Sequence, residues 1–218
     1  MRPILSATHT YNYALAKWLD DKLKPLSYNQ YTVTDTFQFV NEIQGIEIHH
    51  GEILVSYDVT SLFTNVPLQE TIQILADKAF CDDWFNKTYK LNLTRAELVY
   101  LLRAATHNQL FQFDGVLYEQ TDGVAMGSPL GPLLANVFMC SIEAKLQQDG
   151  KLPSFYRHYV DDTLTIMPDR ESADCFLRNL NDCHPSIKFT MEVETDASPL
   201  YRCMLNSLHP ENWDEGLY

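Results

Sequence analysis

The amino-acid sequence predicts an α+β fold in which helices pack against an antiparallel sheet, an arrangement related to the ferredoxin-like plan. Two observations support this prediction: short apolar strand patterns alternate with segments of helical periodicity, and two hairpin patterns join neighbouring strands. From Asp58 onward the expected order is strand, helix, hairpin, helix, hairpin, helix, strand. The chain has 218 residues, of which 45% are hydrophobic and 12% aromatic, so it can bury a core and should not be disordered.

Two helices are expected before the first strand. Apolar residues recur at helical spacing over about residues 10–24, which predicts an amphipathic helix that ends at Pro25. A shorter helix should follow Thr34 or Asp35, both of which are residue types that begin helices. The side chains expected on its buried face are Phe37, Val40 and Ile43.

The first strand and two further helices are expected in the middle of the chain. Residues 52–58 (EILVSYD) form a short, apolar, β-branched run that ends at an aspartate, as in a buried strand. Pro67 suits the first residue of the helix that follows. Thr94 and Glu97 form a capping-box pattern, which predicts the start of another helix.

Two hairpins are expected in the second half of the chain. Residues 110–120 predict the first, with Asp114-Gly115 at its turn. Residues 154–167 predict the second, with Asp161-Asp162 at its tip. The remaining helices and a strand with one buried face are expected over residues 133–146, 172–182 and 187–193.

Charge and cysteine content limit the classes of function. The formal net charge is -13, from 16 Lys+Arg and 29 Asp+Glu, which argues against a chain that holds nucleic acid by itself. No apolar run approaches the roughly 18 residues that a membrane span needs, and no signal peptide is recognisable. We therefore expect a soluble intracellular protein, nuclear or cytoplasmic. Its cysteines lack metal-ligand spacing and should be free thiols: Cys81, Cys140, Cys175, Cys183 and Cys203.

Three aspartates stand at the ends of predicted strands. Asp58 ends the first strand, and Asp161 and Asp162 are adjacent in a turn between apolar strands. Each has an ordinary explanation, because aspartate favours turns and strand ends. The intervening helices and hairpin would, however, return the chain to a strand beside the first. Carboxylates gathered in this way repel one another unless cations neutralise them, and two Mg²⁺ ions about 3.5–4 Å apart can activate a 3′-hydroxyl and stabilise a leaving pyrophosphate.

Three longer segments resemble the motifs of one protein family. They are YDVTSLFTNVP at residues 57–67, DGVAMGSPLGPLLAN at 122–136 and YRHYVDDT at 156–163. In this order they are similar to motifs A, B and C of the reverse transcriptases of Penelope-like retroelements, and the resemblance covers most of residues 2–193. It implies a polymerase palm with partial fingers. It also implies an RNA-directed DNA polymerase that adds dNTPs to a primer on an RNA or DNA template.

The resemblance assigns roles to individual residues. Asp58, Asp161 and Asp162 would bind two Mg²⁺ ions, with Mn²⁺ able to replace them, and the carbonyl of Val59 would complete a metal site. Phe63 would lie under the sugar of the incoming nucleotide, where its ring would clash with a ribose 2′-hydroxyl. The ordinary alternative for Phe63 is a core phenylalanine.

Further residues are expected at the nucleotide. Gly127 would let the backbone approach the nucleotide closely, as glycine permits, while Met126 replaces the glutamine of many reverse transcriptases and offers no amide. Arg2 resembles the fingers arginine that binds the triphosphate. Lys188 could donate a proton to pyrophosphate, although a lysine on an alternating strand is usually solvated. The glycine-rich segment is equally compatible with a plain loop before a helix, and it is not a P-loop.

The expected organisation is a partial fingers region over residues 1–50, a palm over 51–197 and a divergent tail over 198–218. The family continues into a thumb and usually a GIY-YIG endonuclease, whereas the tail follows neither pattern, so we expect a truncated or domesticated copy. The missing fingers and thumb would account for the acidic charge, because they supply most of the basic surface. Two alternatives stay open: a catalytically inactive remnant that acts as a binding module, and an RNA-dependent RNA polymerase, which Phe63 disfavours.

Overall fold

The computed structural model describes residues 10–107, 109–121 and 123–194 of the chain. The chain forms two compact units, each made from two stretches of sequence. Residues 1–29 and 61–145 form the first, here called the helical unit, and residues 30–60 and 146–218 form the second, here called the sheet unit. Each unit is described separately.

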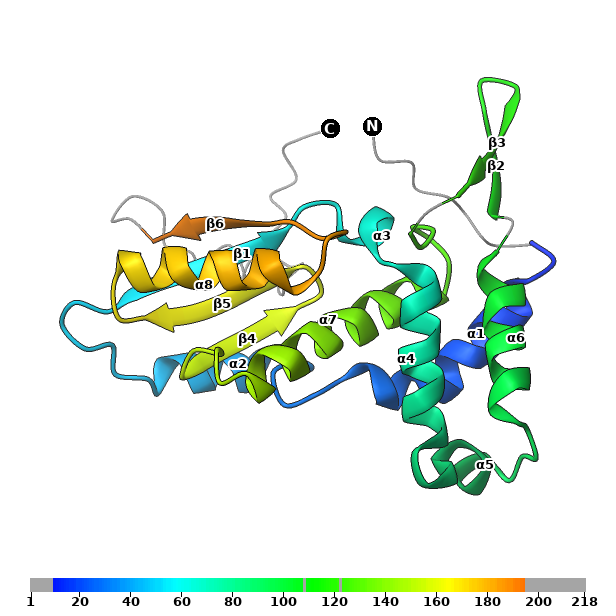
Figure 1. Cartoon of the computed structure of the whole chain (residues 1–218), viewed down its shortest axis with the longest axis horizontal. Coiled ribbons are helices and arrows are strands. Elements are labelled where there is room, and N and C mark those ends of the chain that lie inside the picture. The colour runs from blue at the N-terminus through cyan, green and yellow to red at the C-terminus, as the bar shows by residue number, and fades with distance from the viewer. Residues whose placement is uncertain (1–9, 108, 122, 195–218) are drawn as a thin grey trace. The chain divides into compact units, whose positions relative to one another are not determined.

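The sheet unit is built on a four-stranded antiparallel sheet in the order β4-β5-β1-β6 (Figure 1). Next to β4, the segment around Thr32 extends this sheet through a parallel bridge to His158. The elements of the unit are α2 (Thr36–Gln44), β1 (Ile53–Val59), β4 (Phe155–Tyr159), β5 (Asp162–Met167), α8 (Arg170–Cys183) and β6 (Phe189–Val193).

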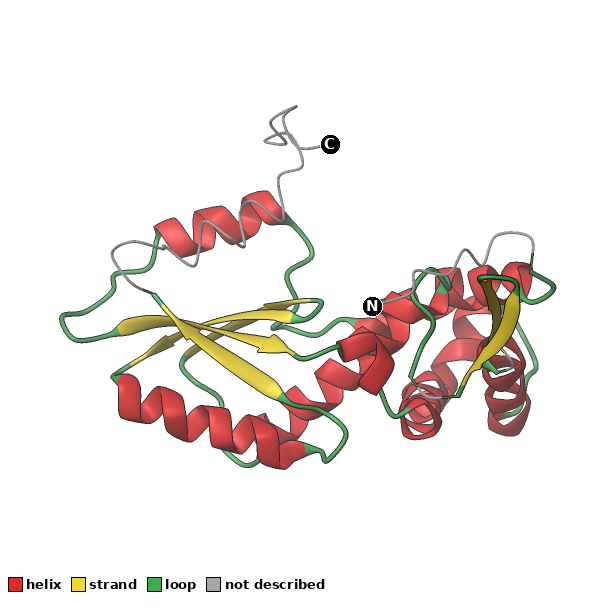
Figure 2. Cartoon of the chain, turned by 90° about the horizontal axis from the view of Figure 1, so that it is seen from above, coloured by secondary structure: helices red, strands yellow, loops and turns green. Residues whose placement is uncertain are grey.

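Helices of the sheet unit cover both faces of its sheet (Figure 2). On one face, the Tyr57 hydroxyl donates to the carbonyl of Ala173 in α8 (3.0 Å), and the Tyr57 ring lies edge-to-face against Phe176. On the other face, Phe39 of α2 packs into a core cluster with strand residues such as Leu54 and Leu164. The alternation of side chains along β1 therefore sends Tyr57 to α8 and Leu54 to α2.

The helical unit contains a bundle in which α6 contacts both α1 and α4. The side chain of Asn12, next to the start of α1, donates to the carbonyl of Ala105 in α6 (3.1 Å) and links the two helices. The elements of the unit are α1 (Tyr13–Leu23), η1 (Lys24–Ser27), α3 (Leu62–Asn65), α4 (Leu68–Phe80), η2 (Cys81–Asp83), α5 (Trp84–Tyr89), α6 (Arg95–Thr106), β2 (Gln109–Phe113), β3 (Val116–Gln120) and α7 (Leu130–Gln148), whose last residues pass into the sheet unit.

The predicted α+β class with an antiparallel sheet and packed helices is confirmed. The capping box is present, because the Thr94 side chain accepts from the backbone of Glu97 while the Glu97 carboxylate accepts from the backbone of Thr94. Asp114 and Gly115 both have positive φ, as the predicted hairpin turn requires. Within the described residues, no helix has both the length and the apolarity to cross a membrane.

Two expectations about local structure were wrong, the buried face of α2 and the tip of the second hairpin. Phe37 is 69% exposed and Phe39 is buried instead, because Phe39 and Ile43, four residues apart, share the face of α2 that meets the sheet. The helix expected over about residues 10–24 is confirmed as α1, which ends at Leu23 and is followed by a short 3₁₀ turn that contains Pro25. The tip of the second hairpin is Val160-Asp161, and Asp162 is already the first residue of β5.

Candidate active site

Two of the three predicted carboxylates face each other in the sheet. Asp58 is the second-last residue of β1 and lies directly opposite Asp162, the first residue of β5. On its other side, Asp58 lies opposite Thr190 of β6. Both aspartates project to the same face, because opposed residues of an antiparallel pair share one face. The sheet therefore brings together residues that are far apart in the sequence.

The third carboxylate lies in the turn that joins β4 and β5. The backbone N–H of Val59 donates to the carbonyl of Asp161 (3.3 Å), which attaches the turn to the end of β1. Val160, the other residue of this two-residue turn, has a φ of 56°. A β-branched residue rarely adopts this left-handed conformation, which costs on the order of 1–3 kcal/mol, so the turn beside the carboxylates is strained.

The acids of this group lie close enough together to disfavour one another's charged forms. Burial, and after it the neighbouring charges of Asp161, Asp58 and Glu192, together raise the pKa of Asp162 to about 6. Oxygen donors that repel one another in this way suit a hard divalent cation, which would neutralise them. The residues present therefore fit the magnesium site expected from the sequence, although their role as ligands stays a prediction.

Glu192 is a fourth acid at this site, and the sequence reasoning missed it. It lies on β6 opposite Ser56, two residues before Asp58 on β1. The strict alternation of residues 187–193 was a usable signal, since it puts Glu192 on the polar side of its strand. The pairing of β6 with β1, on which its place near Asp58 depends, carries no local signal.

Phe63 lies in the helical unit, where the glycine-rich segment holds it in place. The carbonyl of Phe63 accepts a hydrogen bond from the backbone N–H of Val124 (2.7 Å). Gly123 has a φ of +69°, and a Cβ there would lie 2.4 Å from the same carbonyl oxygen. Gly131 also approaches the Phe63 ring, at 3.6 Å from a Cβ built on it. Residues from the first two motif segments are thus packed directly against each other.

A cavity of about 520 Å³ in the helical unit is lined by three of the four residues predicted to bind the nucleotide. Phe63, Met126 and Gly127 all line it, and Gly127 has a φ of +102°, which glycine adopts without strain. The other lining residues are Ser128, Pro129 and Pro132 of the glycine-rich segment and Tyr13, Lys17 and Asp20 of α1. The residues of α1 were not singled out from the sequence.

Two further residues were predicted at the nucleotide, Arg2 and Lys188. Arg2 lies outside the described residues. Lys188 is exposed just before β6, and its carbonyl accepts from the backbone N–H of Thr60 (2.8 Å), which fixes the approach to that strand.

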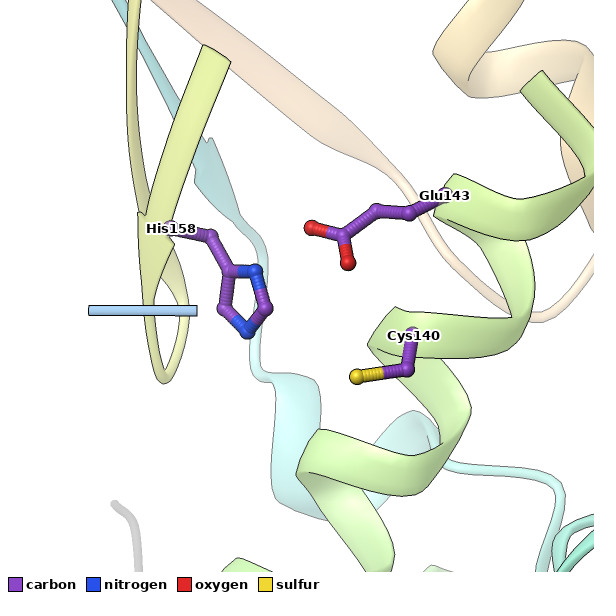
Figure 3. A group of neighbouring side chains, drawn as sticks. All are labelled: Cys140, Glu143 and His158. Carbon is purple, nitrogen blue, oxygen red and sulfur yellow. The ribbon is translucent and has the colours of Figure 1, made fainter. Parts of the chain in front are cut away.

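Buried polar groups also occur on α7, where no site was predicted. Cys140 and Glu143 point from the same side of this helix, about one turn apart (Figure 3). The Glu143 carboxylate accepts from the side chain of Asn29 (2.6 Å), and the Cys140 thiol donates to the carbonyl of Ser27 (3.5 Å). Within the helical unit, these two contacts attach α7 to the segment that follows α1. His158, the third residue drawn in Figure 3, belongs to β4 of the sheet unit.

Comparison with known protein families gives a match over most of the chain. Residues 1–194 match the family described as reverse transcriptase (RNA-dependent DNA polymerase). The telomerase reverse transcriptase of Rattus norvegicus is 29% identical over 124 residues, which cover 55% of this chain and 9% of the relative.

Solved structures with a similar fold include two kinds of polymerase. The telomerase of Candida albicans, solved with a fragment of telomeric RNA, has a TM-score of 0.59 at 13% identity, covering 84% of this chain and 35% of its own. The RNA-dependent RNA polymerase of BmCPV at its elongation state has a TM-score of 0.54 at 13% identity, covering 88% of this chain and 19% of its own. At these identities the likeness shows the fold alone, which is that of a polymerase palm. The chain spans about a third or less of each of these proteins.

Proposed function

The chain belongs to the reverse transcriptase (RNA-dependent DNA polymerase) family, and from this premise we propose that it transfers dNTPs to the 3′-hydroxyl of a primer paired with an RNA or DNA template. The observation that supports this most directly is the grouping of Asp58, Asp161 and Asp162 at one end of the sheet. Carboxylates crowded in this way repel one another, and a divalent cation bound between them would neutralise their charge.

The proposed metal ligands are these three aspartates and the carbonyl of Val59. When bound, two Mg²⁺ ions, or Mn²⁺ in their place, would lower the pKa of the primer hydroxyl and stabilise the charge on the leaving pyrophosphate. The chain's own contribution is to hold the carboxylates in place through the β1–β5 pairing and the Val59–Asp161 hydrogen bond. Glu192 adds negative potential that would attract the cations.

Phe63 is proposed to select deoxynucleotides. Its backbone is fixed by Val124, and the close approach of Gly123 leaves the local chain no room to move away. A ring held in this way excludes a ribose 2′-hydroxyl by steric contact. The same steric contact favours DNA synthesis over RNA synthesis, the activity for which the similar BmCPV RNA-dependent RNA polymerase is named. The amino-acid sequences of the three motif segments also support a Penelope-like origin. Arg2 is proposed to bind the triphosphate of the nucleotide.

Primer extension tests the proposal. Purified protein is given an oligo(dT) primer on poly(rA), dTTP and Mg²⁺ or Mn²⁺, with rUTP in a parallel reaction. Incorporation of dTTP by the native chain and its loss in Asp161→Asn would support the proposal. The matched control is Glu47→Gln, which removes one exposed charge from the same unit outside the carboxylate group.

The outcomes separate the alternatives. Preferential use of rUTP would assign RNA synthesis instead. Equal incorporation by the native chain and by Asp161→Asn would contradict the catalytic proposal. It would favour the alternative of an inactive chain that acts as a binding module.

A further inference from the structure

One wall of the cavity around Phe63 is formed by a helix with no assigned function. Tyr13, Lys17 and Asp20 line this cavity and follow one another at helical spacing along α1. The rest of the lining consists of Phe63 and five residues of the glycine-rich segment: Met126, Gly127, Ser128, Pro129 and Pro132. The cavity is therefore mainly apolar with a single cation on its α1 side, a combination that suits a ligand with an apolar body and an anionic group.

The acidic charge of the chain is distributed very unequally between the two units. In the sequence of the helical unit, 10 Lys+Arg stand against 11 Asp+Glu, whereas the sheet unit has 6 against 18. The net charge that argued against nucleic-acid binding therefore belongs almost entirely to the unit with the carboxylate group. The helical unit is close to neutral, so the positive potential of a lysine at its cavity is not cancelled by a large excess of acidic residues in that unit.

Lys17 is distinguished from the other lysine of α1 by its surroundings. The ammonium group of Lys22 lies 4.5 Å from the centre of the Tyr89 ring, so a cation–π contact already engages it. Lys17 is exposed and lines the cavity. Its ammonium group can therefore meet a ligand there without first breaking a contact with an aromatic ring.

We infer that α1 forms the second wall of the proposed nucleotide cavity and that Lys17 binds a phosphate of the nucleotide or strand seated in it. An ammonium group forms charge-assisted hydrogen bonds with phosphate oxygens, and lysine is a common phosphate ligand. The apolar wall would contact base and sugar, because aromatic and apolar side chains stack on nucleobases. The inference rests on the proposed function for the identity of the ligand, but not on catalysis.

Asp20 lines the same wall of the cavity as Lys17 and carries the opposite charge. Burial raises the pKa of its carboxyl group, while the charges of Lys24 and Lys17 act to lower it. At neutral pH the carboxylate would compete with a phosphate for Lys17 and repel the phosphate directly. Removal of each charge should thus have opposite effects on affinity, whereas damage to the helix would weaken binding in both cases.

Equilibrium binding with Lys17→Gln, Asp20→Asn and Lys90→Gln tests this. Lys90 is an exposed lysine of the helical unit that does not line the cavity. Two probes are used: a fluorescent oligo(dT) primer on an RNA template, followed by anisotropy, and labelled dTTP captured with the protein–primer–template complex. We expect Lys17→Gln to weaken the binding of one of these probes about 5- to 10-fold, and Asp20→Asn to strengthen the binding of the same probe about 2- to 5-fold. Lys90→Gln should leave the affinity for both probes unchanged.

The two probes identify the source of the phosphate. If the affinity for the duplex changes, and the slope of log affinity against log salt concentration falls by about 1, the phosphate belongs to the strand. If only the affinity for dTTP changes, the phosphate belongs to the incoming nucleotide. The inference is overturned if Lys17→Gln matches Lys90→Gln with both probes, or if Asp20→Asn weakens binding as Lys17→Gln does. Because binding is measured without turnover, a chain that fails to extend primers can still support or overturn it.

Discussion

Asp58 and Asp162 lie directly opposite each other on neighbouring antiparallel strands, at the end where β1 meets the β4–β5 turn. Opposed residues hold their Cβ atoms about 4.5–5.5 Å apart, and like charges in such a pair destabilise a sheet. Asp161 and Glu192 add two more acids to the surroundings of this pair. The sheet thus contains an unfavourable charge group, and this has measurable consequences for folding as well as for the proposed chemistry.

The first consequence is a pH dependence of stability without divalent cations. The pKa of Asp162 rises from 3.8 to about 6 on folding, so between these pH values the folded chain binds more protons than the unfolded chain. The stability associated with this group is therefore fully present below about pH 4 and is lost as the pH rises through about 6. Since the side chain is only half-buried, solvent screening limits the effect to about 1–2 kcal/mol.

Urea unfolding in EDTA at pH 4, 5, 6 and 7 measures this effect. The quantity of interest is the difference between the native chain and Asp162→Asn, because other groups titrate in both. Asp162→Asn should gain stability relative to the native chain as the pH rises from 4 to 7. A constant difference over this range would show that Asp162 does not titrate as described.

The second consequence is stabilisation by the metal. A cation that binds only the folded chain stabilises it, and a site of millimolar affinity would contribute about 1.4 kcal/mol at tenfold excess over its Kd. For a chain of this size that corresponds to a rise in Tm of about 3–6 °C. Thermal unfolding at pH 7.5 in 10 mM MgCl₂ and in EDTA measures it, with KCl used to match ionic strength. The rise should disappear in Asp58→Asn, and an equal Tm of the native chain in both buffers would argue against the site.

The features predicted correctly from the sequence have short-range causes. The capping box needs only Thr94 and Glu97, and the first hairpin turn needs only Asp114 and Gly115, which both adopt the positive φ that their residue types favour. Asp58 could be placed at a strand end because the apolar run before it is local. In each case the determining contacts lie within a few residues of one another.

The features that were missed depend on which distant segments pair. Glu192 reaches the carboxylate group only because β6 pairs with β1, and nothing within residues 187–193 specifies that partner. Phe37 and Phe39 are both large and apolar, and only the orientation of α2 on the sheet decides that Phe39 is buried. In the sequence, Lys17 and Asp20 resemble ordinary solvated residues of an amphipathic helix. Only the structure shows that they line a cavity together with Phe63.

A third prediction concerns the contact between the first two motif segments. Gly123→Ala should destabilise the chain by about 2–4 kcal/mol, because the new Cβ would overlap the Phe63 carbonyl and the residue would keep a strained positive φ. Gly115→Ala is the matched control, since Gly115 also has a positive φ but no atom within 4 Å of a Cβ built there. It should cost only about 1 kcal/mol. Urea unfolding compares the two variants, and equal losses would mean that the close packing on Phe63 contributes nothing.

The strained turn beside Asp161 leads to the last prediction. Val160 has a φ of 56°, which asparagine tolerates far better than a β-branched residue. Val160→Asn should therefore stabilise the folded chain by about 1 kcal/mol, the lower end of the strain expected at such a position, because the partly buried valine methyl groups are lost at the same time. The control is Val116→Asn, at an exposed position that also adjoins a hairpin turn but lacks a positive φ. Urea unfolding in EDTA should show a gain for Val160→Asn and none for Val116→Asn. A loss at position 160 would mean that the packing of the valine outweighs its backbone strain, and that the conformation of the turn is not what limits stability at the carboxylate group.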